Sequence, residues 1–349
     1  MANHHHPPKG TNPMTDNPIL HALAREGVLI NVSVRFWRAS KKLEPGDLGL
    51  DAASLDERLI SLGRKRLLPK DALAQFALIE SRAHAMVEQS TFPFLGGIAH
   101  FLPNRKLSET RQGLDALRGD FEAAKAKFKD AYADLRENAI EEWRELAREL
   151  SLDARTVIAK IEASYPEPDA LDRYFGFEVR LYQIRAPESL EAECVTFADQ
   201  EYIVEARKRA ATDAAAQMGR ESEAFVGECV ATLRQEAAKV CEDMLSSIQT
   251  GKTEGVHQKT LNRLLKFIED FKALNFAGDA EFDRILENAR STLLSKTAEE
   301  YRDNAAALTR LQSGLKGLAQ TAKTLAQQDA HAIVSRFGQL GTRKFTLAA

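Results

Sequence analysis

Hydrophobic residues form a narrow, evenly spaced stripe from Leu107 to Leu150. Its members are separated by alternating steps of three and four, which is the a/d spacing of a coiled-coil helix. They are Leu114, Leu117, Phe121, Ala124, Phe128, Ala131 and Leu135, followed by Ile140, Trp143 and Leu146. Ser108 is the expected N-cap, and no proline interrupts the stretch. A helix with so narrow a stripe needs long partner helices, because it cannot bury itself.

The C-terminal half supplies such partners. One long helix is predicted from about Leu190 to Thr250 and a second from about Asp279 to Val334, with a shorter amphipathic helix from Leu261 to Leu274 between them. Helices of up to about 60 residues would be roughly 90 Å long. We expect two or three of them to pack as an antiparallel stalk.

Period-two alternation predicts strands elsewhere. Val28 to Phe36 is the clearest example, and Tyr174 to Ile184 repeats the pattern. The apolar stretch Phe92 to Pro103 contains Gly96-Gly97 and predicts a strand or a hairpin. Because an isolated strand leaves its backbone groups unsatisfied, we expect the three segments to form one small antiparallel sheet.

The segments between these strands give shorter elements. Trp37 to Asp51 predicts an ordered loop, Ser54 to Leu62 a short helix, and Pro69 the start of another helix. A break near Ser151 precedes one more short helix. The inward face of the helix after Pro69 consists of Ala72, Phe76, Ile79, Ala83 and Val87.

Together these elements predict a mainly α protein: an elongated antiparallel helical bundle or coiled-coil stalk with a small antiparallel β-sheet head. The predicted domains are a disordered leader at 1–17, a small α+β head at 18–106 and 163–190, a long-helix stalk at 107–162 and 191–338, and a flexible tail at 339–349.

Composition agrees with long solvated helices, because charged residues make up 28% of the chain and aromatic residues only 7%. The net charge of −3 does not select a class of partner. Cys194, Cys229 and Cys241 lie far apart in helical patterns, which favours reduced thiols and a cytoplasmic setting. No run of about 18 apolar residues predicts a membrane-spanning helix. The leader has no apolar core typical of a signal peptide.

Motifs for catalysis are missing from the sequence. Thr250 to Thr253 reads TGKT, but the phosphate-binding pattern needs a glycine where Ser246 stands. The histidines show no metal-ligand spacing, and no GxSxG or Cys-His arrangement occurs. His4, His5 and His6 belong to the leader. We therefore expect no enzyme activity, no cofactor and no metal.

A basic cluster is the strongest candidate for a contact region. Residues 35–70 hold nine basic and five acidic residues, which gives a local charge of +4. Trp37 lies among them and is expected to stack on a base or on a partner's side chain. The candidate contact residues are Arg35, Trp37, Arg38, Lys41, Lys42, Arg64, Lys65 and Arg66. Protein contact, nucleic-acid contact and a merely solvated surface all remain open.

The stretch FPFLGGIAHFLP, Phe92 to Pro103, has two interpretations. It is either a buried sheet element or an apolar tongue of the kind that helical pore-forming proteins insert into membranes. Its length and its glycine and proline punctuation favour the buried sheet element.

Several segments also resemble a known family. VLINVSVRFWRASKKLEPGDLGLD, SLGRKRLLPKDAL, FLGGIAHFLP and YFGFEVRLYQI are similar to the bacterial family called domain of unknown function 3150, over about residues 25–190. The family has no assigned catalytic residues to transfer. The resemblance implies a phage or mobile-element setting, often beside a MoxR-type AAA+ ATPase and a protein with a von Willebrand factor A domain.

The sequence therefore predicts a non-enzymatic interaction or structural protein, an adaptor or component of such an ATPase assembly. The alternatives are a nucleic-acid-binding accessory factor of a mobile element and a helical pore former. Self-association is plausible in each case, because the helical stripes can also join two chains.

Overall fold

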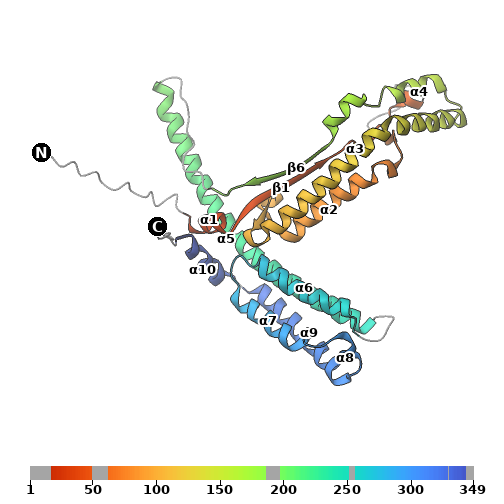
Figure 1. Cartoon of the computed structure of the whole chain (residues 1–349). Coiled ribbons are helices and arrows are strands. Elements are labelled where there is room, and N and C mark those ends of the chain that lie inside the picture. Colours follow the sequence, from red (N-terminus) through yellow and green to blue (C-terminus); the bar gives the residue numbers. More distant parts are fainter. Residues whose placement is uncertain (1–16, 49–61, 186–196, 251–255, 329, 343–349) are drawn as a thin grey trace. The chain divides into compact units, whose positions relative to one another are not determined.

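The computed structural model describes residues 17–48, 62–185, 197–250, 256–328 and 330–342 (Figure 1). It is mainly helical, with a small antiparallel sheet of four strands, as predicted. The chain divides into two compact units. The first comprises Met1–Ile30, Ser90–Leu107 and Leu181–Ala349, and the second comprises Asn31–Gln89 and Ser108–Arg180.

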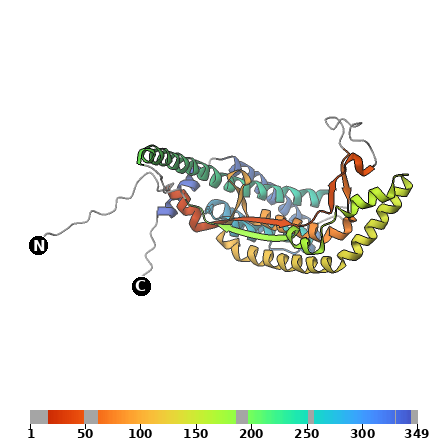
Figure 2. The same ribbon diagram turned by 90° about the horizontal axis from the view of Figure 1, so that it is seen from above.

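The sheet has the strand order β4-β5-β1-β6. Its strands are β1 (Gly27–Arg35), β4 (Phe92–Phe94), β5 (Ala99–Pro103) and β6 (Gly176–Tyr182). In the first unit, the start of β1 pairs antiparallel with β5, with Gly27 opposite Pro103 and Ile30 opposite His100. Figures 1 and 2 show β1 and β6 side by side. All three predicted strand regions are thus confirmed.

Strands β4 and β5 form a hairpin in the first unit, with Phe92 opposite Phe101. The turn is tight, because Leu95, Gly96 and Gly97 all adopt positive φ angles of 48°, 66° and 86°. Ile98 at the turn is 79% exposed. The strand phenylalanines are buried, so the prediction that this stretch is a sheet element is confirmed.

The first unit is built around α5. Its helices are α1 (Pro18–Glu26), α5 (Phe197–Thr250), α6 (Gln258–Leu274), α7 (Ala280–Leu293), α8 (Ala298–Arg302), α9 (Ala305–Gln327) and α10 (His331–Thr342). Helix α5 packs along α9 and α6, and α1 packs against α10. Aromatic rings join the hairpin to this core: Phe101 lies 4.7 Å from Phe276 and 5.6 Å from Phe225, measured between ring centroids.

The predicted single helix from Asp279 to Val334 is wrong. The structure divides it into α7, α8, α9 and α10. Thr297 and Glu300 form a reciprocal capping box that starts α8, and the Asn304 side chain caps α9 by accepting from the Ala307 backbone N–H. These caps satisfy the amide groups that a new helix start leaves unpaired.

The second unit packs α2, α3 and α4 around an aromatic core. Its helices are α2 (Ala74–Ser90), α3 (Asn104–Glu149, whose first turn belongs to the first unit) and α4 (Ala154–Glu162). The Phe76 ring centroid lies 5.5 Å from Phe36, 5.4 Å from Phe121 and 5.0 Å from Phe175. Four of the five residues predicted for the inward face of α2 are buried, namely Phe76, Ile79, Ala83 and Val87. The fifth, Ala72, lies before α2 in the 3-10 helix Lys70–Leu73 and is only partly buried.

Two short strands add a ribbon that the sequence did not predict. Strand β2 (Ser40–Lys42) pairs antiparallel with β3 (Arg64–Arg66). Strand β2 lies within the segment predicted as an ordered loop, and β3 lies after it. The short 3-10 helix Pro45–Leu48 follows β2. Most of the helix predicted at Ser54 to Leu62 lies outside the described residues.

The hydrophobic stripe of α3 holds only in its first half. Leu114, Leu117, Phe121, Ala124 and Phe128 are buried, but the next buried positions are Tyr132, Ala139 and Ala147. Leu146 is 39% exposed. A straight α-helix drifts by about 20° per heptad from the coiled-coil repeat, so the buried face moves away from the predicted positions.

The coiled-coil stalk is not confirmed. Beyond its first turn, α3 belongs to the second unit, with most of β6 and nearly all of α2, while α5 packs with α9 and α6 in the first unit. Helix α3 also begins at Asn104, before the predicted cap Ser108. An ion pair connects the first turn of α3 to α6, because the Lys106 ammonium lies 2.6 Å from the Asp270 carboxylate. No helix in the described ranges is long and apolar enough to cross a bilayer.

Candidate functional site

The structure separates the predicted basic cluster into paired, buried and exposed members. Arg35 pairs with Glu178 at 2.8 Å, and Arg38 forms a two-pronged ion pair with Glu80 at 2.6 and 3.1 Å. The Arg38 guanidinium also lies 3.9 Å from the centroid of the Phe36 ring. Both arginines are therefore already engaged within the second unit.

Trp37 lies in the core of the second unit. It is 8% exposed, and its ring packs edge-on against Tyr132 at a centroid distance of 5.9 Å and in a tilted arrangement against Tyr165 at 6.0 Å. The Tyr165 hydroxyl donates to the Leu67 carbonyl, and burial raises its pKa to about 12. The expectation that Trp37 stacks on a partner is wrong for this structure, because its ring is covered by these tyrosines.

Lys65 is also removed from the surface. Its ammonium lies 2.8 Å from the Asp47 carboxylate, and the exposed fractions of the two side chains are 6% and 7%. Burial alone would raise the pKa of Asp47, but the hydrogen bonds from Lys65 and from the Glu44 backbone N–H hold that pKa below its ordinary value. Lys65 therefore anchors the ribbon to the 3-10 helix Pro45–Leu48.

The remaining cations are exposed on the ribbon. Lys42 lies directly opposite Arg64, and Ser40 lies opposite Arg66. Opposite residues of paired strands share a face, and so do alternate residues along one strand. Lys42, Arg64 and Arg66 therefore project from the same face of the ribbon, and we call these three residues the cation face. Lys41 is exposed as well. The Arg64 Nε donates to the Ser40 hydroxyl at 3.0 Å and its Nη2 to the Ser40 carbonyl at 3.2 Å, which fixes the guanidinium.

An apolar groove adjoins the cation face. It has a volume of about 320 Å³ and lies between the segment that follows β3 and the C-terminal half of α3. Its lining consists of Arg66, Leu67, Leu68, Pro69, Ala139, Glu142, Trp143 and Leu146. The Trp143 Nε1–H donates to the Arg66 carbonyl at 2.9 Å, so the indole is held in the groove wall with its polar atom satisfied. Arg66 thus belongs to both the groove and the cation face.

The exposed cations and the apolar groove are features suited to binding. Exposed guanidinium and ammonium groups attract carboxylates or phosphates, and a small apolar groove accepts an aliphatic or aromatic side chain. In the described part of the chain, no group of three His, Cys, Asp or Glu side chains is placed to hold a metal ion.

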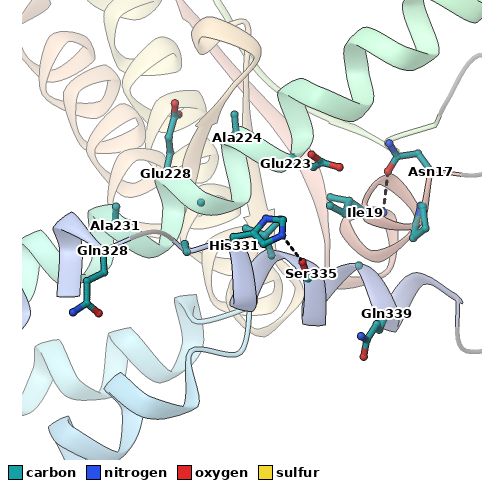
Figure 3. Close-up of a pocket in the computed structure, with 15 residues that line it drawn as sticks. Asn17, Ile19, Glu223, Ala224, Glu228, Ala231, Gln328, His331, Ser335 and Gln339 are labelled. Atoms are coloured by element: carbon teal, nitrogen blue, oxygen red, sulfur yellow. Dashed lines mark hydrogen bonds between the residues drawn. The ribbon is translucent and has the colours of Figure 1, made fainter.

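The first unit contains a larger hollow that the sequence did not reveal. It has a volume of about 710 Å³ and lies between α1, α5 and α10 (Figure 3). Its floor includes Ala224, Gly227 and Ala231 of α5, and His331 contacts Ser335 at 3.5 Å on the α10 side. The three contributing segments are far apart in the sequence, so no local pattern signals this site.

A family model matches residues 25–204, which is just over half of the chain, and its description is "Protein of unknown function (DUF3150)". The chain belongs to the DUF3150 family. The resemblance seen in the sequence is thereby confirmed, and the match extends slightly beyond the segments that carried it. No curated protein and no solved structure matches the chain.

The DUF3150 match contains the cation face and all of the apolar groove, since these residues lie between 42 and 146. It also contains the eight sequence-predicted contact residues. By contrast, the α5 and α10 residues that line the hollow of the first unit follow the matched segment. The DUF3150 description assigns no activity, so function must be argued from the sites themselves.

Proposed function

We propose that this DUF3150 protein is a non-enzymatic interaction protein whose second unit binds an acidic, partly apolar segment of a partner protein. The observation that carries the proposal is that Arg66 belongs both to the cation face and to the apolar groove. A partner segment placed there would set carboxylates against Lys42, Arg64 and Arg66 and one apolar side chain in the groove.

The groove distinguishes this proposal from a purely electrostatic surface. Binding energy at protein interfaces concentrates in a few anchors that fill desolvated pockets, and charged residues around them chiefly set orientation and association rate. Leu146 lines the groove and is 39% exposed, so it offers apolar surface against which such an anchor can pack. An AAA+ ATPase or a von Willebrand factor A protein, the partners implied by the family resemblance, is the class of partner we propose.

Nucleic-acid binding is the second candidate, and the cation face is the observation that favours it. A two-stranded ribbon can present cations to phosphates, and β-ribbon proteins use this arrangement on DNA. Its binding would fall steeply with salt and would not need the groove.

Capture of the tagged protein from its native host tests the proposal, with and without nuclease and followed by mass spectrometry. We expect a partner protein that survives nuclease and is lost when Lys42, Arg64 and Arg66 are changed together to glutamate. Recovery of nucleic acid, with every protein lost on nuclease treatment, would favour the second candidate. Unchanged recovery by the charge-reversed variant would refute the site.

A further inference from the structure

The hollow of the first unit follows α5 for more than two helical turns. Its α5 residues run from Glu223 to Ala231, which spans about 12 Å at the helical rise. One wall comes from α10 and the segment before it, and Asn17, Pro18 and Ile19 close the end near α1 (Figure 3). The hollow is therefore an elongated groove, which we call the α5 groove, and its volume of about 710 Å³ is within the usual range for small-molecule sites.

The charges along the α5 groove are of one sign. At about 100° per residue, Ala224, Gly227 and Ala231 fall on one narrow face of α5, and Glu223 and Glu228 flank that face by about 40° on opposite sides. Both glutamates are exposed. No lysine or arginine occurs among the lining residues that the structure describes.

The rest of the lining offers neutral acceptors and apolar surface. Gln328, Ser335 and Gln339 supply amide and hydroxyl groups, and His331 is the other titratable group. The Asn17 side-chain oxygen already accepts from the Ile19 and Leu20 backbone N–H groups as the cap of α1. Small side chains on the floor leave a flat apolar strip between the two carboxylates. A ligand that fits must be narrow, elongated, apolar along its length and positively charged, because each of these properties matches one feature of the groove.

We propose that the α5 groove binds a linear aliphatic polyamine. Its ammonium groups would donate charge-assisted hydrogen bonds to Glu223 and Glu228, and its methylene segments would lie on the strip formed by Ala224, Gly227 and Ala231. This site is independent of the proposed partner surface, because every residue that lines it belongs to the first unit.

Titration calorimetry of the full chain with spermidine at physiological salt tests the proposal. We expect saturable binding of one spermidine per chain, weakened about tenfold or more when Glu223 and Glu228 are changed to glutamine. The matched control changes Glu269 and Glu281, two exposed glutamates of α6 and α7, to glutamine. It alters the net charge equally and should keep the wild-type affinity.

A second variant tests the groove itself. A Cβ added at Gly227 would meet only the Val334 Cγ2 atom, at an ordinary distance of 4.0 Å, so Gly227→Leu is expected to fold and to fill the floor. It should abolish spermidine binding while leaving the melting temperature equal or higher. Absence of saturable binding to the wild type, equal weakening in the control, or full binding by Gly227→Leu would each overturn the proposal.

Discussion

The Lys65 ammonium lies 2.8 Å from the Asp47 carboxylate, with both side chains almost fully buried. A lysine in the middle of the basic run Arg64-Lys65-Arg66 is thus an internal anchor, while its two neighbours are exposed. The alternation follows from the strand, because successive side chains of β3 point to opposite faces.

Breaking this pair should destabilise the protein strongly. Lys65→Met leaves the Asp47 carboxylate buried without its cation and should lower the free energy of unfolding by about 3–5 kcal/mol. Changing Asp47 to leucine in the same chain should restore most of the loss, because no buried charge then remains. Urea unfolding followed by circular dichroism measures both effects. A loss below about 1 kcal/mol, typical of an exposed pair, would contradict the buried anchor.

Asp172 should make stability depend on acid pH. Hydrogen bonds from Lys125 and Lys129 lower the pKa of its carboxyl from 3.8 to about 2 in the folded protein. Its stabilising effect is therefore complete above its ordinary pKa and disappears as the pH falls towards 2. Melting temperatures of the wild type and Asp172→Asn should differ at pH 5 and converge near pH 2.

The matched variant for this prediction changes Lys125 and Lys129 to methionine. It removes the same two ion pairs, which have N–O distances of 2.8 and 2.9 Å, by replacing the cations and keeping the carboxylate. It should show the same loss of acid dependence as Asp172→Asn. A constant difference between wild type and Asp172→Asn across this pH range would show that the ion pairs are not formed.

The thiols of Cys229 and Cys241 should be unreactive in the folded protein. Burial raises the pKa of Cys241 to about 12 and that of Cys229 well above its ordinary value, so neither forms the reactive thiolate near neutral pH. In a Cys194→Ser variant, iodoacetamide at pH 8 should label neither cysteine before unfolding and both in denaturant. Rapid native labelling, measured by intact mass, would contradict their burial in α5. Cys194 itself lies outside the described residues.

Tryptophan fluorescence tests the position of Trp37. The chain has two tryptophans, so Trp143→Phe leaves Trp37 as the sole emitter. Because its ring packs against Phe128, Tyr132 and Tyr165, its emission should be blue-shifted and resistant to acrylamide. The Trp37→Phe variant, which reports the half-buried Trp143, should be quenched more readily. Equal quenching of the two variants would contradict the core position of Trp37.

Local patterns in the sequence predicted most of the elements and little of their assembly. Period-two alternation located β1 and β6, and glycine punctuation located the β4-β5 hairpin. The α3 stripe showed which residues start the buried face. It could not show that a sheet and α2 cover this face, because the face must be apolar whether a strand or a long helix packs against it.

The features that the sequence did not predict have specific physical causes. The capping box at Thr297 and Glu300 was visible in the sequence, but the leucine stripe beyond it favoured one continuous helix. Burial of Lys65 and Trp37 depends on Asp47, Tyr132 and Tyr165, which reach them only through tertiary packing. The α5 groove joins three distant segments, so it also follows only from the folded chain.

The most direct test of the interaction account compares partner capture by three forms of the full chain. These are the wild type, the charge reversal of Lys42, Arg64 and Arg66 to glutamate, and a control with the same charge change. The control reverses Arg82, Arg111 and Lys127, which are exposed elsewhere in the second unit. All three forms should have similar melting temperatures.

After nuclease treatment, the cation-face variant should recover about a tenth or less of the partner that the wild type recovers, and the control should recover nearly all of it. Leu146→Ser, which removes the exposed wall of the apolar groove, should also reduce recovery. Equal recovery by the wild type and the cation-face variant would contradict the central claim that this surface binds the partner protein.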